Sequence, residues 1–103
     1  VVFKKDNIQF NIYDESNSTE IRRLYENLIS LISQLKLNEA EDNLFEKVNN
    51  NDLIYMKVAI DFYDRLNKLS DEELEKANFT REEIKLGIED ILKLYNVSLP
   101  FLN

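Results

Sequence analysis

The chain has 103 residues, the usual length of one domain with one modest core. It contains no cysteine and no histidine, which excludes disulfides, thiol nucleophiles, thiolate metal sites and imidazole bases. The formal net charge is -7, with the acids concentrated between residues 39 and 90, so binding to nucleic acid is disfavoured.

The first predicted element is a β-hairpin over residues 1–14. Ile8, Phe10 and Ile12 alternate with polar residues in the period-two pattern of a half-buried strand. Residues 1–4 are expected to pair with this strand through a turn at residues 5–7. A two-stranded ribbon is marginal by itself, so we expect it to lie on helices or to pair with another chain.

Five helices are predicted after the hairpin, at residues 17–36, 39–49, 52–69, 71–77 and 81–95. The first has the clearest pattern, because apolar residues recur at three- and four-residue steps from Ile21 to Leu35. Leu28 and Ile60 are the residues that we expect in the core. The tail at residues 97–103 is expected to be extended, because Pro100 cannot continue a helix.

The helix starts are predicted from capping residues. Asn17, Asn38, Ser70 and Thr80 are each followed three residues later by glutamate, the reciprocal pattern of a capping box, and Asp52 is expected to cap the third helix. The sequence therefore predicts a mostly α fold, in which an N-terminal β-hairpin precedes a bundle of about five helices in a single domain spanning residues 1–103.

Carboxylates are the abundant reactive groups, and pairs such as Asp61 and Asp64 stand three residues apart on one predicted helix. Such pairs can serve glycoside hydrolysis or bind a hard cation, but a glycosidase needs a deep cleft and helical di-iron sites need histidine. The single glycine, Gly87, falls inside a predicted helix, so no glycine-rich phosphate loop is possible. We expect a protein that is not an enzyme and has no catalytic residue, cofactor or metal site.

The two ends of the chain are predicted to bind a protein client, because they are more apolar than a small soluble domain needs there. The residues concerned are Ile8, Phe10 and Ile12 in the hairpin and Leu99, Phe101 and Leu102 in the tail. In an alternative interpretation both ends cover the helical core, and a homo-oligomer is a further open alternative. No apolar run is long enough to span a membrane and the N-terminus lacks the layout of a signal peptide, so we expect no membrane association and a cytoplasmic location.

Two segments resemble a known family. Residues 3–14 (FKKDNIQFNIYD) resemble the opening of small tail assembly chaperones of Gram-positive phages and prophages, although that family usually has glycine where this chain has Asn7. Residues 58–64 (VAIDFYD) resemble an aromatic and acidic segment that follows later in that family. The resemblance implies a non-structural phage protein that keeps the tape measure protein soluble while tail-tube subunits assemble, and it carries over no catalytic residue.

A second resemblance gives an alternative function. Residues 78–84 (NFTREEI) and the apolar tail are similar to the last helix of bacteriocin immunity proteins, which are cytoplasmic helical bundles that normally lack an N-terminal hairpin. A third alternative is an acidic inhibitor that mimics DNA and binds a host protein.

Overall fold

The computed structural model describes residues 19–97, which form five α-helices. These are α2 (Thr19–Ser33), α3 (Leu37–Lys47), α4 (Leu53–Asn67), α5 (Asp71–Lys76) and α6 (Arg81–Leu94). The predicted helical bundle is thus confirmed for this part of the chain. The predicted hairpin at residues 1–14, the predicted cap Asn17 and residues 98–103 of the predicted tail lie outside the described residues.

The predicted fold class, which combined a β-hairpin with helices, is wrong. The regular elements of residues 19–97 are all helices, with no strand among them, so the fold class is all-α. The hairpin was inferred from the short alternation between Ile8 and Ile12, with residues 1–4 as its partner strand and a turn at residues 5–7, and such a pattern is too short to establish a sheet. The buried residues of the described region also come from helices packed on helices, which is an architecture that needs no sheet to complete its core.

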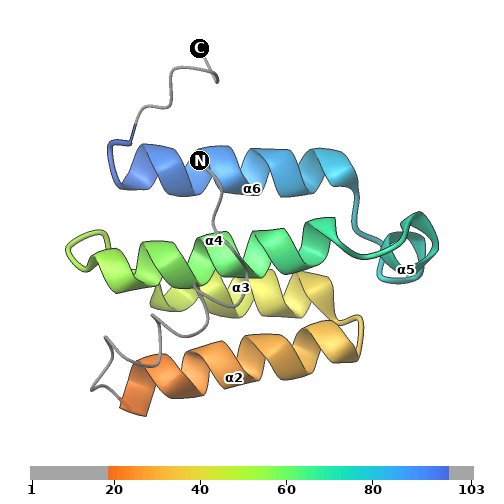
Figure 1. Cartoon of the computed structure of the whole chain (residues 1–103), viewed down its shortest axis with the longest axis horizontal. Helices are drawn as coiled ribbons and strands as arrows, with labels where there is room; N and C mark the ends of the chain where they lie inside the picture. The colour runs from red at the N-terminus through yellow and green to blue at the C-terminus, as the bar shows by residue number, and fades with distance from the viewer. Residues whose placement is uncertain (1–18, 98–103) are drawn as a thin grey trace.

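The four longer helices run alternately in opposite directions (Figure 1). α2 packs closely against α3, α4 packs closely against α6, and α2 also contacts α4, so the fold consists of two antiparallel helix pairs joined along α2 and α4. α3 and α6 approach each other far less closely than the helices within each pair. Close helix packing therefore does not close the surface between α3 and α6.

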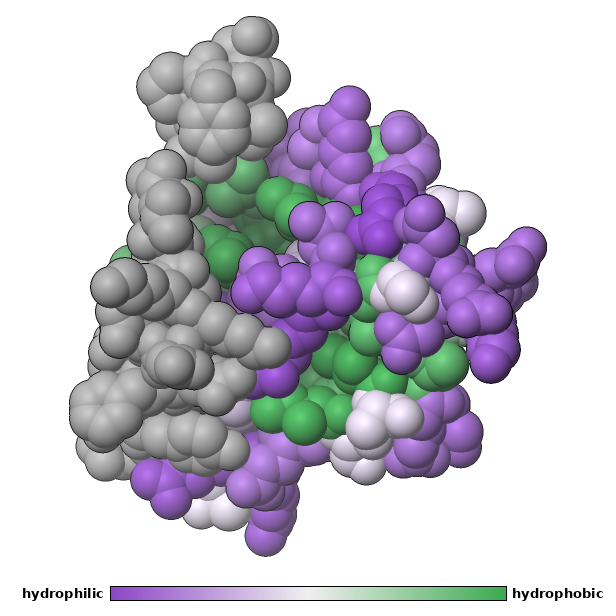
Figure 2. All heavy atoms as spheres, turned by 45° about the vertical axis from the view of Figure 1, so that its right-hand side comes forward, coloured by the Kyte–Doolittle hydropathy of each residue, from purple (hydrophilic) through white to green (hydrophobic). Residues whose placement is uncertain are grey.

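The core is built from one apolar face of each helix. Its completely or almost completely buried side chains are Tyr25, Leu28, Leu37, Ala40, Leu44, Val58, Ala59, Phe62, Tyr63, Leu66, Phe79 and Ile91. Leu28 is buried as predicted, whereas Ile60 is only partly buried. Ile60 belongs to a helix that is apolar on most sides, so its spacing alone does not identify which residues face the core. Figure 2 shows that hydrophilic side chains cover much of one face of the described surface, with hydrophobic ones visible between them.

Side-chain caps fix the starts of α4, α5 and α6. The Asp52 carboxylate accepts a hydrogen bond from the Ile54 amide, and complete capping boxes stand at Ser70 and Thr80, as the sequence predicts. The predicted cap at Asn38 is wrong, because α3 already begins at Leu37 and its N-cap, Lys36, makes no side-chain cap. Leu37 is completely buried, so packing places it inside the first turn of α3.

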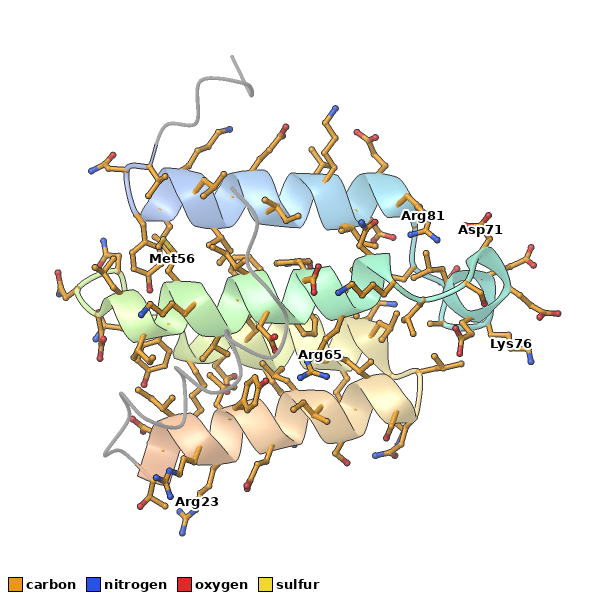
Figure 3. The ribbon with its side chains drawn as sticks, in the orientation of Figure 1. Arg23, Met56, Arg65, Asp71, Lys76 and Arg81 are labelled. Carbon is orange, nitrogen blue, oxygen red and sulfur yellow. The ribbon has the colours of Figure 1, made fainter. Side chains whose placement is uncertain are left out.

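Arg81 ties α6 to the segment that connects it with α4. Its guanidinium donates hydrogen bonds to the carbonyl oxygens of Asn67 and Leu69 at 2.9 and 2.8 Å, and to Asp71 Oδ1 at 3.1 and 2.9 Å. Figure 3 shows Arg81 directed toward Asp71 at the junction of these helices. Because Asp71 is almost fully exposed, the carbonyl contacts near the end of α4 matter more for stability than the ion pair.

Candidate protein-binding groove

The residues predicted to bind a partner are Ile8, Phe10, Ile12, Leu99, Phe101 and Leu102. All six lie outside the described residues, so the client-binding surface predicted at the ends of the chain stays a prediction. The candidate site in residues 19–97 is a different surface, the one between α3 and α6, which has a hollow at one end and which we call the α3–α6 groove.

Tyr63 of α4 and Gly87 of α6 lie buried beneath the middle of the α3–α6 groove. Tyr63 is completely buried, and Gly87 lies so close to its ring that a β-carbon at position 87 would overlap the ring atoms. The phenol of Tyr63 donates a hydrogen bond of 2.5 Å to Glu41 Oε2 on α3. The side chain of Tyr63 thus reaches from α4 to α3, and α6 packs against the same ring at Gly87. Both helices that border the groove therefore contact this one residue.

Acidic side chains gather at the middle of the groove. Burial raises the pKa of the Glu41 carboxyl above its usual value of 4.5, the hydrogen bond from Tyr63 lowers it, and the negative charges of Glu83, Asp42 and Asp90 raise it further. Glu83 and Asp90 belong to α6, so acids from both rims act on one another. The Glu83 carboxylate also accepts hydrogen bonds from Thr80 in the capping box.

The pKa of Tyr63 is raised by the same arrangement. Burial is the largest cause, and the hydrogen bond to Glu41 and the charges of Glu41 and Asp90 add to it. The phenol is therefore neutral at physiological pH and acts as a hydrogen-bond donor. Among residues 19–97, no three acidic side chains are placed so that they could hold a metal ion together.

One end of the groove is apolar. Phe45 and Leu94 are each 37% exposed, and with the partly buried Val48 they line a hollow of about 480 Å³. The rest of its lining is Asn49, Asn50 and Asp90, so the hollow has an apolar wall and a polar rim. Large apolar side chains exposed together are the usual mark of a protein interaction site.

A hydrogen-bond anchor holds this apolar end in place. The phenol of Tyr95, just after α6, donates to the carbonyl oxygens of Asn49 and Asp52 at 2.6 and 3.1 Å. Burial, followed by the charge of Asp52, raises the pKa of Tyr95 to about 12, so the phenol keeps its proton. The turn between α3 and α4 is thereby fixed to the end of α6.

At the opposite end of the groove, where α3 begins, Asn38 donates hydrogen bonds to the carbonyl oxygens of Ala77 and Asn78, each at 3.4 Å.

The carboxylate pair considered from the sequence, Asp61 and Asp64, is not a joint site. Asp61 Oδ2 accepts a hydrogen bond from Arg65 at 2.8 Å, and Asp64 pairs with Lys68 at 3.0 Å, so each acid has its own cation one turn along α4. Asp61 is completely buried against α2, whereas the pair of Asp64 and Lys68 is much more exposed. Separate partners and separate environments disfavour their use as two cooperating carboxylates.

Sequence reasoning missed the groove because it assigned one of its residues to another role. Glu41 was expected to complete the capping box that begins at Asn38. The spacing of Glu41, Phe45 and Val48 at four and three residues could have indicated a shared face on α3. That spacing does not reveal that the neighbouring helix stays far enough away to leave the face open.

Residues 19–97 form an all-helical bundle whose surface between α3 and α6 is acidic in its middle and apolar at one end. The chain belongs to DUF6483, a family of unknown function whose model matches residues 1–96. Searches of curated proteins and of solved structures return no match. The similarities to phage tail assembly chaperones and to bacteriocin immunity proteins stay predictions. No helix within residues 19–97 has the length and apolar character needed to cross a membrane.

Proposed function

We propose that this protein acts by binding another protein in the α3–α6 groove. The observation that carries the proposal is the hollow lined by Phe45, Val48 and Leu94, which exposes large apolar side chains at a place held rigid by Tyr95. Burial of such side chains by a partner yields roughly 25 cal/mol for each Å² of apolar area removed from water. The acids along the groove add selectivity for the partner's charge.

A tail assembly chaperone and a bacteriocin immunity protein both act by binding proteins, so either proposed class could use this groove. The partners differ: a tape measure or tail-tube protein in the first case, and a bacteriocin or its target in the second. We favour the tail assembly chaperone because the segment that resembles this family, residues 58–64 of α4, includes Tyr63. Tyr63 lies beneath the groove and donates a hydrogen bond to Glu41 on α3. Identification of the bound partner distinguishes the two classes.

Site-specific photo-crosslinking tests the proposal. A photoreactive amino acid replaces Leu94 in the groove, and in a matched control it replaces Arg23, an exposed residue of α2 that lies outside this groove (Figure 3). In the cells that make the protein, we expect one defined adduct from position 94 and not from position 23. The captured partner is then identified by mass spectrometry, purified and tested for binding to the full chain.

The double substitution Phe45→Ser with Leu94→Ser provides the decisive comparison. Both side chains are partly exposed, so we expect the variant to keep its fold by circular dichroism while its affinity for the purified partner falls by about tenfold or more, roughly the loss of 1.4 kcal/mol. Equal adducts at both positions, or unchanged affinity of the folded variant, would show that the groove is not the binding surface.

A further inference from the structure

The shape of the α3–α6 groove restricts the kind of segment that fits it. Both rims are α-helices, whose main-chain groups are bonded within each helix, so the groove offers no sheet edge to an extended strand. A helical segment satisfies its own main chain and can bury side chains between two helices in the manner of an additional bundle helix. α3 has 11 residues and α6 has 14, which corresponds to rims of roughly 16 to 21 Å at about 1.5 Å per residue.

The charges in the groove define the second property of the partner. Three acids act on Glu41 through their charges: Asp42 beside it on α3, and Glu83 and Asp90 on α6. A lysine or arginine placed among them would compensate their mutual repulsion and make charge-assisted hydrogen bonds. An acidic segment would add a like charge to a site where burial already disfavours ionisation of Glu41.

The order of the features gives the partner's sequence pattern. Glu41 stands one turn before Phe45 on α3, and Asp90 stands one turn before Leu94 on α6. α3 and α6 run in the same direction (Figure 1), so the apolar hollow adjoins the acidic middle on both rims, and Asp90 belongs to both. A helix that fills the groove needs a large apolar residue for the hollow and basic residues about one turn away.

We propose that the α3–α6 groove binds a basic amphipathic helix of a partner protein, about 11 to 14 residues long. This inference rests on the proposed protein-binding function and specifies its partner. A second copy of this chain is a poor occupant, because each copy carries a net charge of -7 and would bring acids to an acidic groove. Nucleic acid is repelled for the same reason.

A displayed library of helical peptides tests the proposal. Each 14-residue peptide carries leucine at positions 4, 8 and 11, and lysine, glutamine or glutamate at random on the flanking positions. The full chain is the bait, and the Phe45→Ser, Leu94→Ser variant serves for counter-selection. We expect the enriched peptides to carry lysine well above glutamate, and their binding to weaken as salt is raised.

A charge variant provides the matched control. Glu41→Gln, Glu83→Gln and Asp90→Asn together remove three negative charges, while glutamine at position 83 can still accept the hydrogen bonds of the capping box. With its fold verified by circular dichroism, this variant is expected to bind the enriched lysine peptides about tenfold or more weakly.

Three results would overturn the proposal. The first is a selection that enriches glutamate or shows no preference for charge, or a folded charge variant that binds the lysine peptides as tightly as the wild type does. Either outcome rejects a basic partner but still allows binding in the groove. The second is failure of any peptide to be enriched over the Phe45→Ser, Leu94→Ser control, which rejects a helical occupant. The third is self-association in analytical ultracentrifugation that this double substitution abolishes, which assigns the groove to a second copy. The crosslinking experiment decides separately whether the groove binds a protein.

Discussion

At the scale of single residues, three helix ends share one backbone turn but differ in the residue that makes it. Leu35, Asn78 and Asn96 have positive φ angles of 59°, 56° and 56°. In each case the amide of the next residue donates a hydrogen bond to the carbonyl oxygen five residues before it, as in a Schellman motif. The amide of Lys36, for example, donates to the carbonyl oxygen of Leu31 at 2.9 Å. Asparagine tolerates this left-handed conformation because its short polar side chain can hydrogen-bond locally, whereas leucine has no such compensation and is strained there.

We therefore expect Leu35→Asn to stabilise the protein. The strain energy relieved should be larger than the stabilisation lost with the partly buried apolar side chain of Leu35. The free energy of unfolding measured in urea titrations should therefore rise by about 0.5 to 1 kcal/mol. The reverse substitution at an equivalent turn, Asn78→Leu, is the matched control and should lower it by about 1 kcal/mol. A stabilising effect of Asn78→Leu would show that backbone strain does not dominate at these turns.

Gly87 gives the second prediction at this scale, because its direct contact with Tyr63 reverses the usual effect of glycine in a helix. An alanine in a helix interior is ordinarily about 1 kcal/mol better than glycine. Here its β-carbon would overlap the Tyr63 ring, which is fixed by its hydrogen bond to Glu41. We expect Gly87→Ala to destabilise the protein by about 1 to 2 kcal/mol, as overpacking does.

A double-mutant cycle with Tyr63→Leu identifies the cause. If the ring is responsible, Gly87→Ala should cost much less, or become stabilising, once leucine has replaced the ring. A stabilising effect of Gly87→Ala in the wild-type background would instead mean that the helix merely tolerates the glycine.

At the scale of elements, the pairing of α3 with α6 across the groove makes stability depend on pH. The pKa of Glu41 is raised in the folded protein, mainly by burial and then by Glu83, Asp42 and Asp90, against the hydrogen bond from Tyr63. Above the usual pKa of 4.5, Glu41 therefore keeps its proton in the folded state but loses it in the unfolded state. The free energy of unfolding falls as pH rises from about 4.5 through the pKa of Glu41 in the folded state.

Glu41→Gln removes this dependence while it keeps an acceptor for the Tyr63 phenol. We expect the stability of the variant relative to wild type to increase from about pH 4.5 upward and to level off above the folded pKa of Glu41. Urea titrations at a series of pH values measure the difference. Asp42→Asn removes a neighbouring exposed charge and serves as the control, and an equal effect of both substitutions would point to general charge repulsion.

The elements also show which parts of the fold can be predicted from sequence. Ser70 and Thr80 mark the starts of α5 and α6, because a capping box depends on a few neighbouring residues. Asn38 has the same local pattern, but burial of Leu37 moves the start of α3 back along the chain. The exposure of Phe45 depends on the distance between α3 and α6, which no local pattern contains. The groove was missed for that reason.

At the scale of the whole molecule, the two helix pairs meet at a buried polar cluster between α2 and α4. Arg65 of α4 donates a hydrogen bond to Asp61 at 2.8 Å and another to the Tyr25 phenol of α2 at 3.0 Å, with its guanidinium carbon 5.7 Å from the centre of the Tyr25 ring. Figure 3 shows Arg65 between these helices. Burial lowers the pKa of Arg65, but the hydrogen bonds and charges of Asp61 and Tyr25 raise it more. The cluster thus holds a charged guanidinium at the joint.

The last prediction is that this cluster stabilises the joint through the pairing of a buried charge. Arg65→Ala leaves the carboxylate of Asp61, whose side chain is only 1% exposed, without its cation, so we expect the free energy of unfolding to fall by about 3 kcal/mol. Lys68→Ala breaks the neighbouring pair with Asp64 on the same helix at the same spacing, but both partners are far more exposed, so the expected loss is below about 0.5 kcal/mol. Replacement of both buried partners, Asp61→Leu with Arg65→Met, should recover most of the loss, because no unpaired charge remains buried. Urea titrations of the four proteins measure these differences. If Arg65→Ala costs no more than Lys68→Ala, burial of the ion pair does not explain how the helix pairs are joined, and the apolar contacts between α2 and α4 suffice.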